Sequence, residues 1–255
     1  MLRHSSILEP SVFHWYLLAA EQGNPYAQFN LALLYRDGAG VAPDEAAACR
    51  WLRRAARQGL AFAQNHLGAL LYQGRGTVQS DREAAHWFRL AAEQGDASAQ
   101  QNFGELYHAG RGVARDPVRA VYWYYQAAEQ ELPSAQRRLG ECHLAGEGVP
   151  RNDGLAMAWL RKAALGDDAA GAHALGLMYR DGRGAPASEP EALHWFRRAA
   201  LLGHAGAQRL LGLACLDAEG GAAGSAGEGV VWLEYAAAQG DAEARARLAR
   251  LRRAG

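Results

Sequence analysis

Three histidines of this sequence share one position, directly before a tryptophan, and histidine is a residue type that can bind a metal or transfer a proton. They are His14, His86 and His194. A zinc ion needs ligands about 2 Å from the metal, which side chains four residues apart on one helix can supply. No two of the nine histidines are spaced in this way with a supporting glutamate. The sequence therefore predicts no metal site, and we interpret these histidines as residues of a helix edge.

Glycine-rich segments are the second feature that could carry chemistry, because backbone N–H groups in such loops can bind phosphate. They read "DGAGV" (37–41), "QGRGT" (73–77), "HAGRGV" (108–113), "LAGEGV" (144–149) and "DGRGA" (181–185). None is followed by Lys-Ser or Lys-Thr, and none fits the dinucleotide-binding pattern after a strand. "GSAGEG" (224–229) does not fit the nucleophile elbow of hydrolases. Helix termination is the better interpretation of these glycines.

Nucleophiles and paired carboxylates do not combine into a catalytic set either. No Ser/His/Asp or Cys/His set can be assembled, and the neighbours Asp167 and Asp168 lie at an expected helix start, where the helix dipole favours them. The aromatic run at 122–125 points in several directions around a helix, so we interpret it mainly as packing, with a partner anchor as the alternative. The sequence thus predicts no catalytic residue, no cofactor-binding residue and no cofactor.

The tryptophans show what organises these residues instead. They are Trp15, Trp51, Trp87, Trp123, Trp159, Trp195 and Trp232. Five successive spacings are 36 residues and the last is 37. An Ala-Ala pair follows each one at the same distance, and a second column reads like "AQNHLGALLY" (63–72). Such regular spacing indicates an internal repeat of one supersecondary unit.

Each repeat predicts two helices. In the first helix, Ala99, Phe103 and Tyr107 recur at intervals of four residues and share one face, and the second helix has its own stripe around Trp87 and Phe88. One helix pair cannot bury its apolar face alone, so neighbouring pairs must stack. We therefore expect an all-α fold, a right-handed α/α superhelix (solenoid) of about six to seven repeats. His14 and His86 would then lie two repeats apart, about 20 Å, too far to share a metal ion.

Composition sets the class of protein and of partner. Of the 255 residues, 49% are hydrophobic and 21% charged, and basic and acidic residues number 27 each, which argues against nucleic acid as a partner. Cys49, Cys142 and Cys215 are widely separated, which favours a reducing compartment. We see no signal peptide and no apolar run long enough to span a membrane. The expected location is the cytoplasm, with the periplasm as the alternative if a signal has been removed.

These columns resemble the Sel-1-like repeat family, whose helix-turn-helix units are related to tetratricopeptide repeats. Residues 63–95 and 99–128 meet the family pattern almost in full, whereas Ala32, Ala249, Glu131, His143 and Cys215 depart from it. The resemblance covers about residues 10–251 as one solenoid, with 1–9 as a leader or cap and a loop expected at 217–230. The repeat units are expected near 24–59, 60–95, 96–131, 132–167, 168–203 and 204–240, with a partial unit at 241–255.

In stacks of this kind the first helix of each unit lines a concave groove. The resemblance therefore implies a protein-binding strip formed by first-helix positions that packing leaves open. These positions are Phe29, Leu33, Arg36, Asp37, Asn65, Tyr72, Gln73, Gln101, Glu105, His108, Arg137, Glu141, His173, Arg180, Asp181 and Arg209. The strip mixes charges with aromatic residues, as surfaces that bind an extended or helical segment do, although an ordinary solvated helix face accounts for any single position equally well.

The expected function is that of a non-enzymatic bacterial scaffold or adaptor that binds another protein or peptide in this groove. A regulator or an immunity partner that inhibits a toxin is a narrower form of this hypothesis. A purely structural role in self-assembly is a third hypothesis. The alternative from another class is a β-lactam-binding or hydrolysing enzyme, by analogy with a cysteine-rich branch of the family that staples each repeat with a disulfide. The three scattered cysteines do not match that branch.

Overall fold

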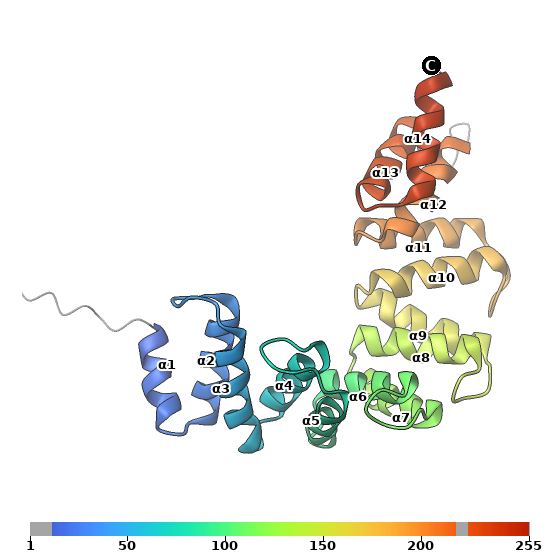
Figure 1. Ribbon diagram of the computed structural model, residues 1–255. Coiled ribbons are helices and arrows are strands. Elements are labelled where there is room, and N and C mark those ends of the chain that lie inside the picture. Colours follow the sequence, from blue (N-terminus) through green and yellow to red (C-terminus); the bar gives the residue numbers. More distant parts are fainter. Residues whose placement is uncertain (1–11, 218–223, 255) are drawn as a thin grey trace, which may run out of the picture. The chain divides into compact units, whose positions relative to one another are not determined.

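The computed structural model describes residues 12–217 and 224–254, which form fourteen α-helices. The helices are α1 (Val12–Glu21), α2 (Pro25–Asp37), α3 (Glu45–Arg57), α4 (Ala61–Gln73), α5 (Asp81–Glu93), α6 (Ala97–Ala109), α7 (Pro117–Glu129), α8 (Pro133–Ala145), α9 (Asp153–Leu165), α10 (Ala169–Asp181), α11 (Glu189–Leu201), α12 (Ala205–Asp217), α13 (Ala226–Ala238) and α14 (Ala242–Ala254). From α1 to α6 and from α8 to α14, each helix packs on the next one along the chain, which confirms the predicted all-α solenoid (Figure 1).

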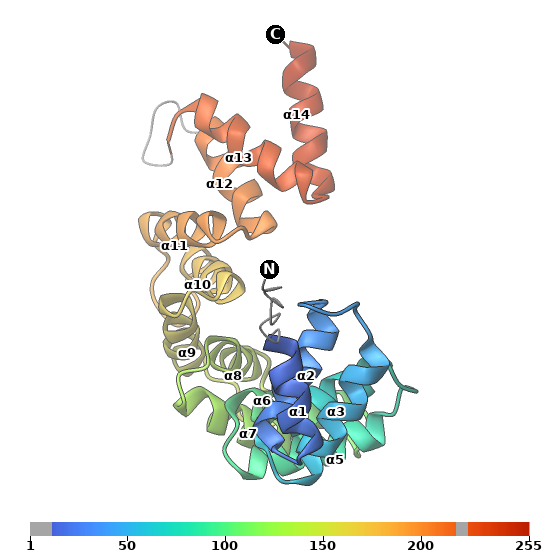
Figure 2. The ribbon, with the colours of Figure 1, turned by 90° about the vertical axis from the view of Figure 1, so that its left-hand side faces the viewer.

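The chain divides into two compact units, and each is described by itself. Unit 1 comprises Met1–Trp123 and unit 2 comprises Tyr124–Gly255, so the boundary lies within α7. Within unit 2, α8 and α10 lie on one side of the stack and α9 and α11 on the other (Figure 2). We call the even-numbered helices first helices and the odd-numbered ones second helices.

Short polar side chains begin most of these helices. Asn24, Asp44, Ser80, Asp96 and Asn152 each accept a hydrogen bond from the backbone N–H three residues later. This contact satisfies one of the backbone donors that the first helical turn leaves open. Asp44 and Asn152 are thus the N-caps of α3 and α9.

In three repeats the second glycine of the G-x-G segment, Gly76, Gly112 or Gly184, lies against the backbone of the preceding repeat. Gly110 ends α6 with a φ of +69°, and Gly112 follows with a φ of +71°. A Cβ atom at Gly112 would lie 2.1 Å from the carbonyl oxygen of Asp81, the first residue of α5. Arg111, between the two glycines, donates two hydrogen bonds of 2.8 Å to the Asp81 carboxylate. The same loop therefore ends a helix and docks on the preceding repeat, which sequence pattern alone does not reveal.

A row of buried glutamines connects the repeats inside the stack. They are Gln28, Gln64, Gln100, Gln136 and Gln208. Each donates from Nε2 to the carbonyl oxygen of the alanine eight residues earlier, at the end of the preceding second helix, over 3.0–3.3 Å. In three repeats the glutamine oxygen also accepts from a second glutamine at 2.7–2.8 Å. Each of these carbonyl oxygens also accepts a backbone N–H from the turn that follows the helix, so the glutamine supplies its second hydrogen bond.

Apolar cores fill each unit around these polar contacts. In unit 1 the Ala-Ala pairs pack with Leu52, Leu67, Phe88 and Phe103, and in unit 2 the core includes Phe196. A Cβ at Gly68 would lie 2.8 Å from the Phe88 ring, so glycine at this column lets a bulky ring of the second helix approach. All three cysteines are buried. None of the helices in the described ranges is long and apolar enough to cross a bilayer.

Glu131 and Asp167 replace a glycine of the repeat pattern, yet they keep the backbone conformation that glycine has at this position. Glu131 stands where other repeats have a glycine such as Gly95, and it adopts the left-handed conformation with a φ of +61°. Asp167 does the same with a φ of +64°. A residue with a Cβ atom has a strained backbone in the left-handed conformation, so the packing of the helices on either side must hold these two turns. The loop expected at 217–230 lies partly outside the described residues, and α13 begins within it at Ala226.

Candidate functional site

All sixteen strip residues lie on first helices, but the structure brings them together in two separate sets. In unit 1, α2 carries four of them, α4 carries three, and α6 carries Gln101, Glu105 and His108. In unit 2, α8 carries Arg137 and Glu141, α10 carries three, and α12 carries Arg209. The two sets differ in chemistry, so each is described within its own unit.

Unit 1 contains two adjoining pockets on its first-helix surface. The α2–α4 pocket has a volume of about 140 Å³, and it is lined by Ala32, Leu33, Arg36, Ala48, Leu52, His66, Ala69, Leu70, Gln73 and Arg75. The α4–α6 pocket has a volume of about 320 Å³, and it is lined by Ala69, Tyr72, Gln73, Phe88, Asn102, Glu105 and Leu106. Because Ala69 and Gln73 line both, the two pockets form one groove.

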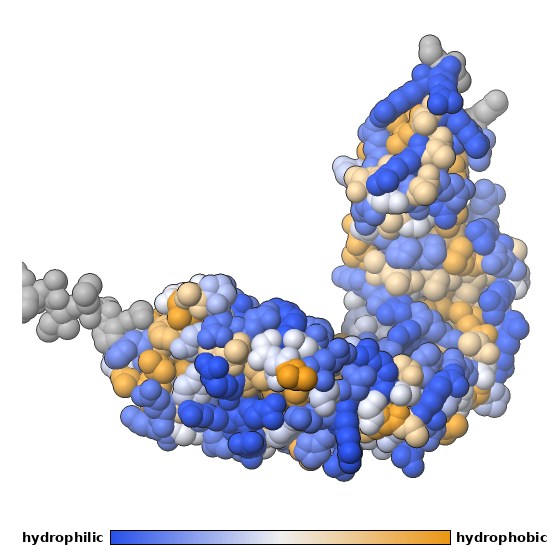
Figure 3. All heavy atoms as spheres, in the orientation of Figure 1, coloured by the Kyte–Doolittle hydropathy of each residue, from blue (hydrophilic) through white to orange (hydrophobic). Residues whose placement is uncertain are grey.

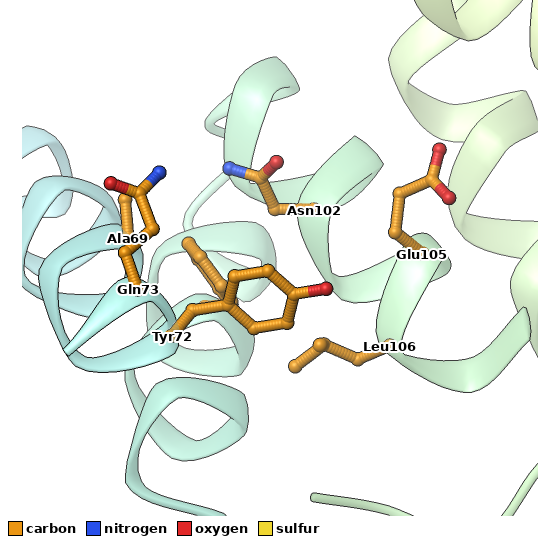
Figure 4. Close-up of a pocket in the computed structure, with 7 residues that line it drawn as sticks. Ala69, Tyr72, Gln73, Asn102, Glu105 and Leu106 are labelled. Carbon is orange, nitrogen blue, oxygen red and sulfur yellow. The ribbon is translucent and has the colours of Figure 1, made fainter. Parts of the chain in front are cut away.

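Polar side chains from two helices surround the α4–α6 pocket. Figure 4 shows Tyr72 and Gln73 extending from α4, and Asn102 and Glu105 extending from α6 into the same space. Asn102 donates a hydrogen bond of 2.9 Å to Asn65, which holds the two amides against each other. Phe88 contributes the apolar floor from the second helix α5. The pocket thus combines an apolar base with hydroxyl, amide and carboxylate groups at its rim.

The two pockets are equivalent positions of successive repeats. Arg36 and Tyr72 are 36 residues apart, as are the floor residues Leu52 and Phe88. A third pocket of about 420 Å³ in unit 2 repeats the arrangement, with Arg180 and Phe196 at the equivalent positions. The fold therefore builds a pocket of one kind at several repeat junctions, while the side chains that line it vary.

Several residues that line the pockets are not among those predicted from the sequence. His66 and Asn102 occupy the position directly after Asn65 and Gln101 in their repeats, and this position also faces the groove. Helical periodicity could have identified them, because positions three or four residues apart share a face, as Asn102 does with Glu105. The floor residues Leu52 and Phe88 look like ordinary core residues in sequence, and only the structure shows that the pocket reaches them.

Some charged side chains of the unit 1 strip form ion pairs with one another. Arg36 donates hydrogen bonds of 2.6 and 2.9 Å to Asp37, and this contact lowers the pKa of the Asp37 carboxyl group. Arg111 lies 3.9 Å from the centre of the Tyr72 ring, in a cation–π contact that orients the ring. The groove therefore offers fixed polar groups and apolar surface rather than one sign of charge.

Two of the three predicted arginines of unit 2 contact the next repeat, whereas Arg180 pairs with Asp181 of its own helix. Arg137 lies 3.2 Å from Asp168 and 2.6 Å from Glu141, and Asp168 accepts the backbone N–H of Gly171 at the start of α10. Arg209 lies 3.2 Å from Asp241, which caps α14 in the same way. Each of these two arginines thus binds the carboxylate that begins the following first helix. A charge reversal at Arg137 would consequently disturb packing between repeats as well as any partner.

In the repeat between these two, a pair of histidines takes the place of the arginine and the capping aspartate: His173 stands in the arginine column and His204 in the aspartate column. The rings of His173 and His204 stack with centroids 4.2 Å apart and an interplanar angle of 20°. His204 Nδ1 accepts the N–H of Ala207 at 3.1 Å, so this ring replaces the capping carboxylate of other repeats. Burial lowers the pKa of His173 to about 4, with further contributions from His204, Arg209 and Arg180. Burial also lowers the pKa of His204, against the opposing effect of Asp168.

We expect unit 2 to lose stability as the pH falls from about 6.5 towards about 4. In this window the unfolded chain binds protons at these histidines whereas the folded chain does not, so protons favour unfolding. Urea denaturation at several pH values should show this loss, and His173→Gln should reduce it. The exposed His194→Gln serves as the matched control and should leave the loss unchanged. An identical pH dependence in His173→Gln would contradict the prediction.

The other residues that the sequence offered for chemistry pack against neighbouring aromatic rings or lie in the core or at the surface. His86 and His194 make edge-on contacts with their neighbours Trp87 and Trp195, at centroid distances of 5.2 and 5.0 Å. In the aromatic run, Tyr124 is buried, whereas Tyr122 is exposed at the surface of unit 1. Among the described residues, no group of three or more His, Cys, Asp or Glu side chains is arranged to hold a metal ion.

Comparison with known proteins identifies the repeat. The family profile described as Sel1 repeat matches residues 13–24, 25–60, 61–96, 97–132, 133–168, 169–204 and 205–241. Among proteins with curated functions, none matches the sequence.

Solved structures share the fold over most of the chain. This chain is similar to c5321, a protective antigen of uropathogenic Escherichia coli. The identity is 38% and the TM-score 0.81, over 93% of this chain and 50% of that one. A Sel1 repeat protein from Oxalobacter formigenes has 33% identity and a TM-score of 0.85, over 93% of this chain and 68% of that one. The immunity protein Pa5087 from Pseudomonas aeruginosa shares the fold alone, at 16% identity and a TM-score of 0.53 over 84% of this chain and 81% of that one.

The chain spans about half the length of the Escherichia coli protein. The repeat profile covers nearly the whole chain, and two structures above 30% identity share its fold. The chain belongs to the Sel1 repeat family.

Proposed function

We propose that this protein is a binding module that holds an extended segment of a partner protein in the groove of unit 1. Sel1 repeat proteins typically act as scaffolds for protein interaction. The observation that carries the proposal is the pair of adjoining pockets at equivalent positions of successive repeats. Such pockets suit a ligand that is itself periodic, and an extended polypeptide is one.

The spacing of the pockets favours side chains three residues apart in the partner. Neighbouring helices that pack together lie about 10 Å apart. An extended chain in the polyproline II conformation advances about 3.1 Å per residue with three residues per turn, so every third side chain lies on one face and would meet a pocket. The smaller α2–α4 pocket suits an aliphatic side chain, and the α4–α6 pocket, with more than twice the volume, suits a larger one.

Amide groups between the pockets support a peptide backbone as the ligand. Asn65, Gln73 and Asn102 each carry an N–H donor and a carbonyl acceptor, the combination that pairs with a peptide unit. They are carried by helices, which hold their positions better than loops do. A groove of this type binds backbone through amides and selects sequence through the pockets.

Ala69→Arg tests the proposal, because Ala69 lines both pockets and an arginine there would obstruct each. Partners captured from a bacterial lysate by the wild-type chain should fall by about tenfold or more with this variant. Ala238→Arg is the matched control, since it adds the same charge at an exposed position of α13. Equal capture by wild type and Ala69→Arg would exclude the groove as the binding site.

The narrower role as a toxin inhibitor is one form of such a module. The immunity protein Pa5087 shares the fold with this chain, so this role extends the proposal. Rescue of cells that express a cognate toxin would test it. Hydrolysis of a β-lactam is the alternative from another class, and a nitrocefin assay on the purified chain should show no turnover.

A further inference from the structure

Unit 2 carries a second first-helix surface, and its chemistry differs from that of the unit 1 groove. On α12, Leu210, Leu213 and Leu216 are half-buried, so part of each side chain reaches the surface. On α14, Arg250 and Arg253 stand one repeat beyond Leu213 and Leu216 and are exposed. Figure 3 shows apolar patches over α10 and α11 and a largely hydrophilic α14. Along this surface an apolar region is therefore followed by a basic one.

The apolar region contains the largest of the three repeat-equivalent pockets. Its volume is about 420 Å³, and α11 supplies Phe196, Ala192 and Leu193 while α12 supplies Leu210 and Ala214. Arg180 and Glu189 stand at the rim. Arg180 is paired with Asp181 at 2.8 Å, so the main feature that this pocket offers a ligand is apolar surface. A bulky aliphatic or aromatic side chain fits this volume and lining.

The basic region retains charge that the described residues do not neutralise. Arg247 lies 3.3 Å from Asp217, and Arg252 reaches Glu234 at 4.0 Å. In contrast, Arg250 and Arg253 form no ion pair with any residue of 12–217 or 224–254. The helix dipole favours basic residues in the last turn, which accounts for Arg253, but Arg250 lies before that turn. Guanidinium groups of this kind bind carboxylates in pairs of hydrogen bonds.

We propose that unit 2 binds a segment of a partner protein in which a bulky apolar side chain is separated by about five residues from a pair of acidic ones. The pocket lies between α10 and α12, and Arg250 lies on α14, on the order of 15 Å away for helices packed at the usual spacing. An extended chain covers that distance in about five residues. The acidic side chains bind Arg250 and Arg253, and the apolar one enters the pocket.

A protein segment fits this surface better than a nucleic acid does. The apolar pocket next to the arginines has no counterpart in a phosphate backbone, and the chain as a whole has zero formal net charge. The site is separate from the groove proposed for unit 1, so one can fail without the other.

Selection from a phage library of random dodecapeptides on the immobilised full-length chain tests this inference. We expect enriched peptides to carry an apolar residue and acidic residues at the stated spacing, with weaker capture at higher ionic strength. Arg250→Glu with Arg253→Glu should reduce capture of these peptides at least about tenfold, and the neutral pair Arg250→Gln with Arg253→Gln should also reduce it. Ala214→Phe, which fills the pocket, should do the same.

Matched variants distinguish binding at this site from binding in unit 1 and from a general effect of charge. Arg57→Glu with Arg82→Glu makes the same charge change at exposed arginines of unit 1 and should leave capture intact. Ala69→Arg should also leave capture of the peptides intact. Loss of capture by this variant would mean that the peptides bind in unit 1, and it would overturn the assignment. Enriched peptides without acidic residues, no enrichment, or unchanged capture by the Arg250 and Arg253 variants would each overturn it. So would binding of phosphatidylserine vesicles or of single-stranded DNA through these arginines in place of peptide.

Discussion

Replacing Gly112 by alanine should lower the melting temperature of the protein by about 6–12 °C, from a loss of about 3 kcal/mol in the free energy of unfolding. The new Cβ would lie 2.1 Å from the carbonyl oxygen and 2.4 Å from the carbonyl carbon of Asp81, both of which are backbone atoms. Backbone at the start of a packed helix cannot move aside as a flexible side chain does. The φ of +71° adds the strain of the left-handed region, about 1 kcal/mol for a residue with a Cβ.

Gly95 supplies the control for this prediction. Its φ is +93°, yet a Cβ there would meet nothing within 4 Å. Gly95→Ala therefore carries the conformational strain without the collision, and we expect a loss of only about 1 kcal/mol. Thermal unfolding followed by circular dichroism compares the two variants. Equal losses would show that glycine is needed at Gly112 for the turn alone, and not for docking on the preceding repeat.

Replacing Gln64 by leucine should cost about 2–3 kcal/mol, although the two side chains are similar in size. Gln64 is 3% exposed, donates to the Ala56 carbonyl oxygen at 3.1 Å and accepts from Gln94 at 2.7 Å. Leucine would remove both of these hydrogen bonds, so the Ala56 carbonyl would keep only the backbone N–H of Gly59, and the Gln94 amide only its bond of 3.2 Å to the Leu90 carbonyl oxygen. Chemical denaturation should show the loss, and full stability in the variant would mean that water reaches these groups.

The fifth repeat provides a natural test of the same role. It has Ala172 where five other repeats have the buried glutamine, and the Ala164 carbonyl instead accepts a hydrogen bond of 2.8 Å from Arg198. Arg198→Ala should therefore destabilise unit 2, and adding Ala172→Gln should restore part of the loss. Additive effects of the two substitutions would contradict a shared role.

Much of the fold follows from local sequence patterns. Trp51 and its equivalents set the repeat, polar residues such as Asp96 begin helices, and Gly110 ends one. These signals act within a few residues of themselves, so they can be recognised without knowing the neighbours. The glutamine column is visible as "AQ" in the sequence, but the partners of Gln64 are eight residues earlier and 30 later. A contact that depends on how repeats stack has no local signal.

The sequence could predict which helices carry the candidate site, but not which of its side chains line pockets or form ion pairs. The resemblance to Sel-1-like repeats placed all sixteen strip residues on first helices, and Tyr72, Gln73 and Glu105 line a pocket. It could not show that Arg137 and Arg209 bind caps of the next helix, since that pairing joins different repeats. Nor could it separate Leu52 and Phe88 from other core residues.

The sequence by itself therefore determined the family, the all-α repeat and the helices that carry the exposed strip, because each of these depends on periodicity and on neighbours along the chain. Only the tertiary structure decided which strip residues line pockets, which ones are engaged between repeats, and that Arg250 and Arg253 keep charge that no described residue matches. The physical reason is that pockets and ion pairs arise where helices far apart in sequence meet, and a side chain that contacts the next repeat is no longer available to a partner.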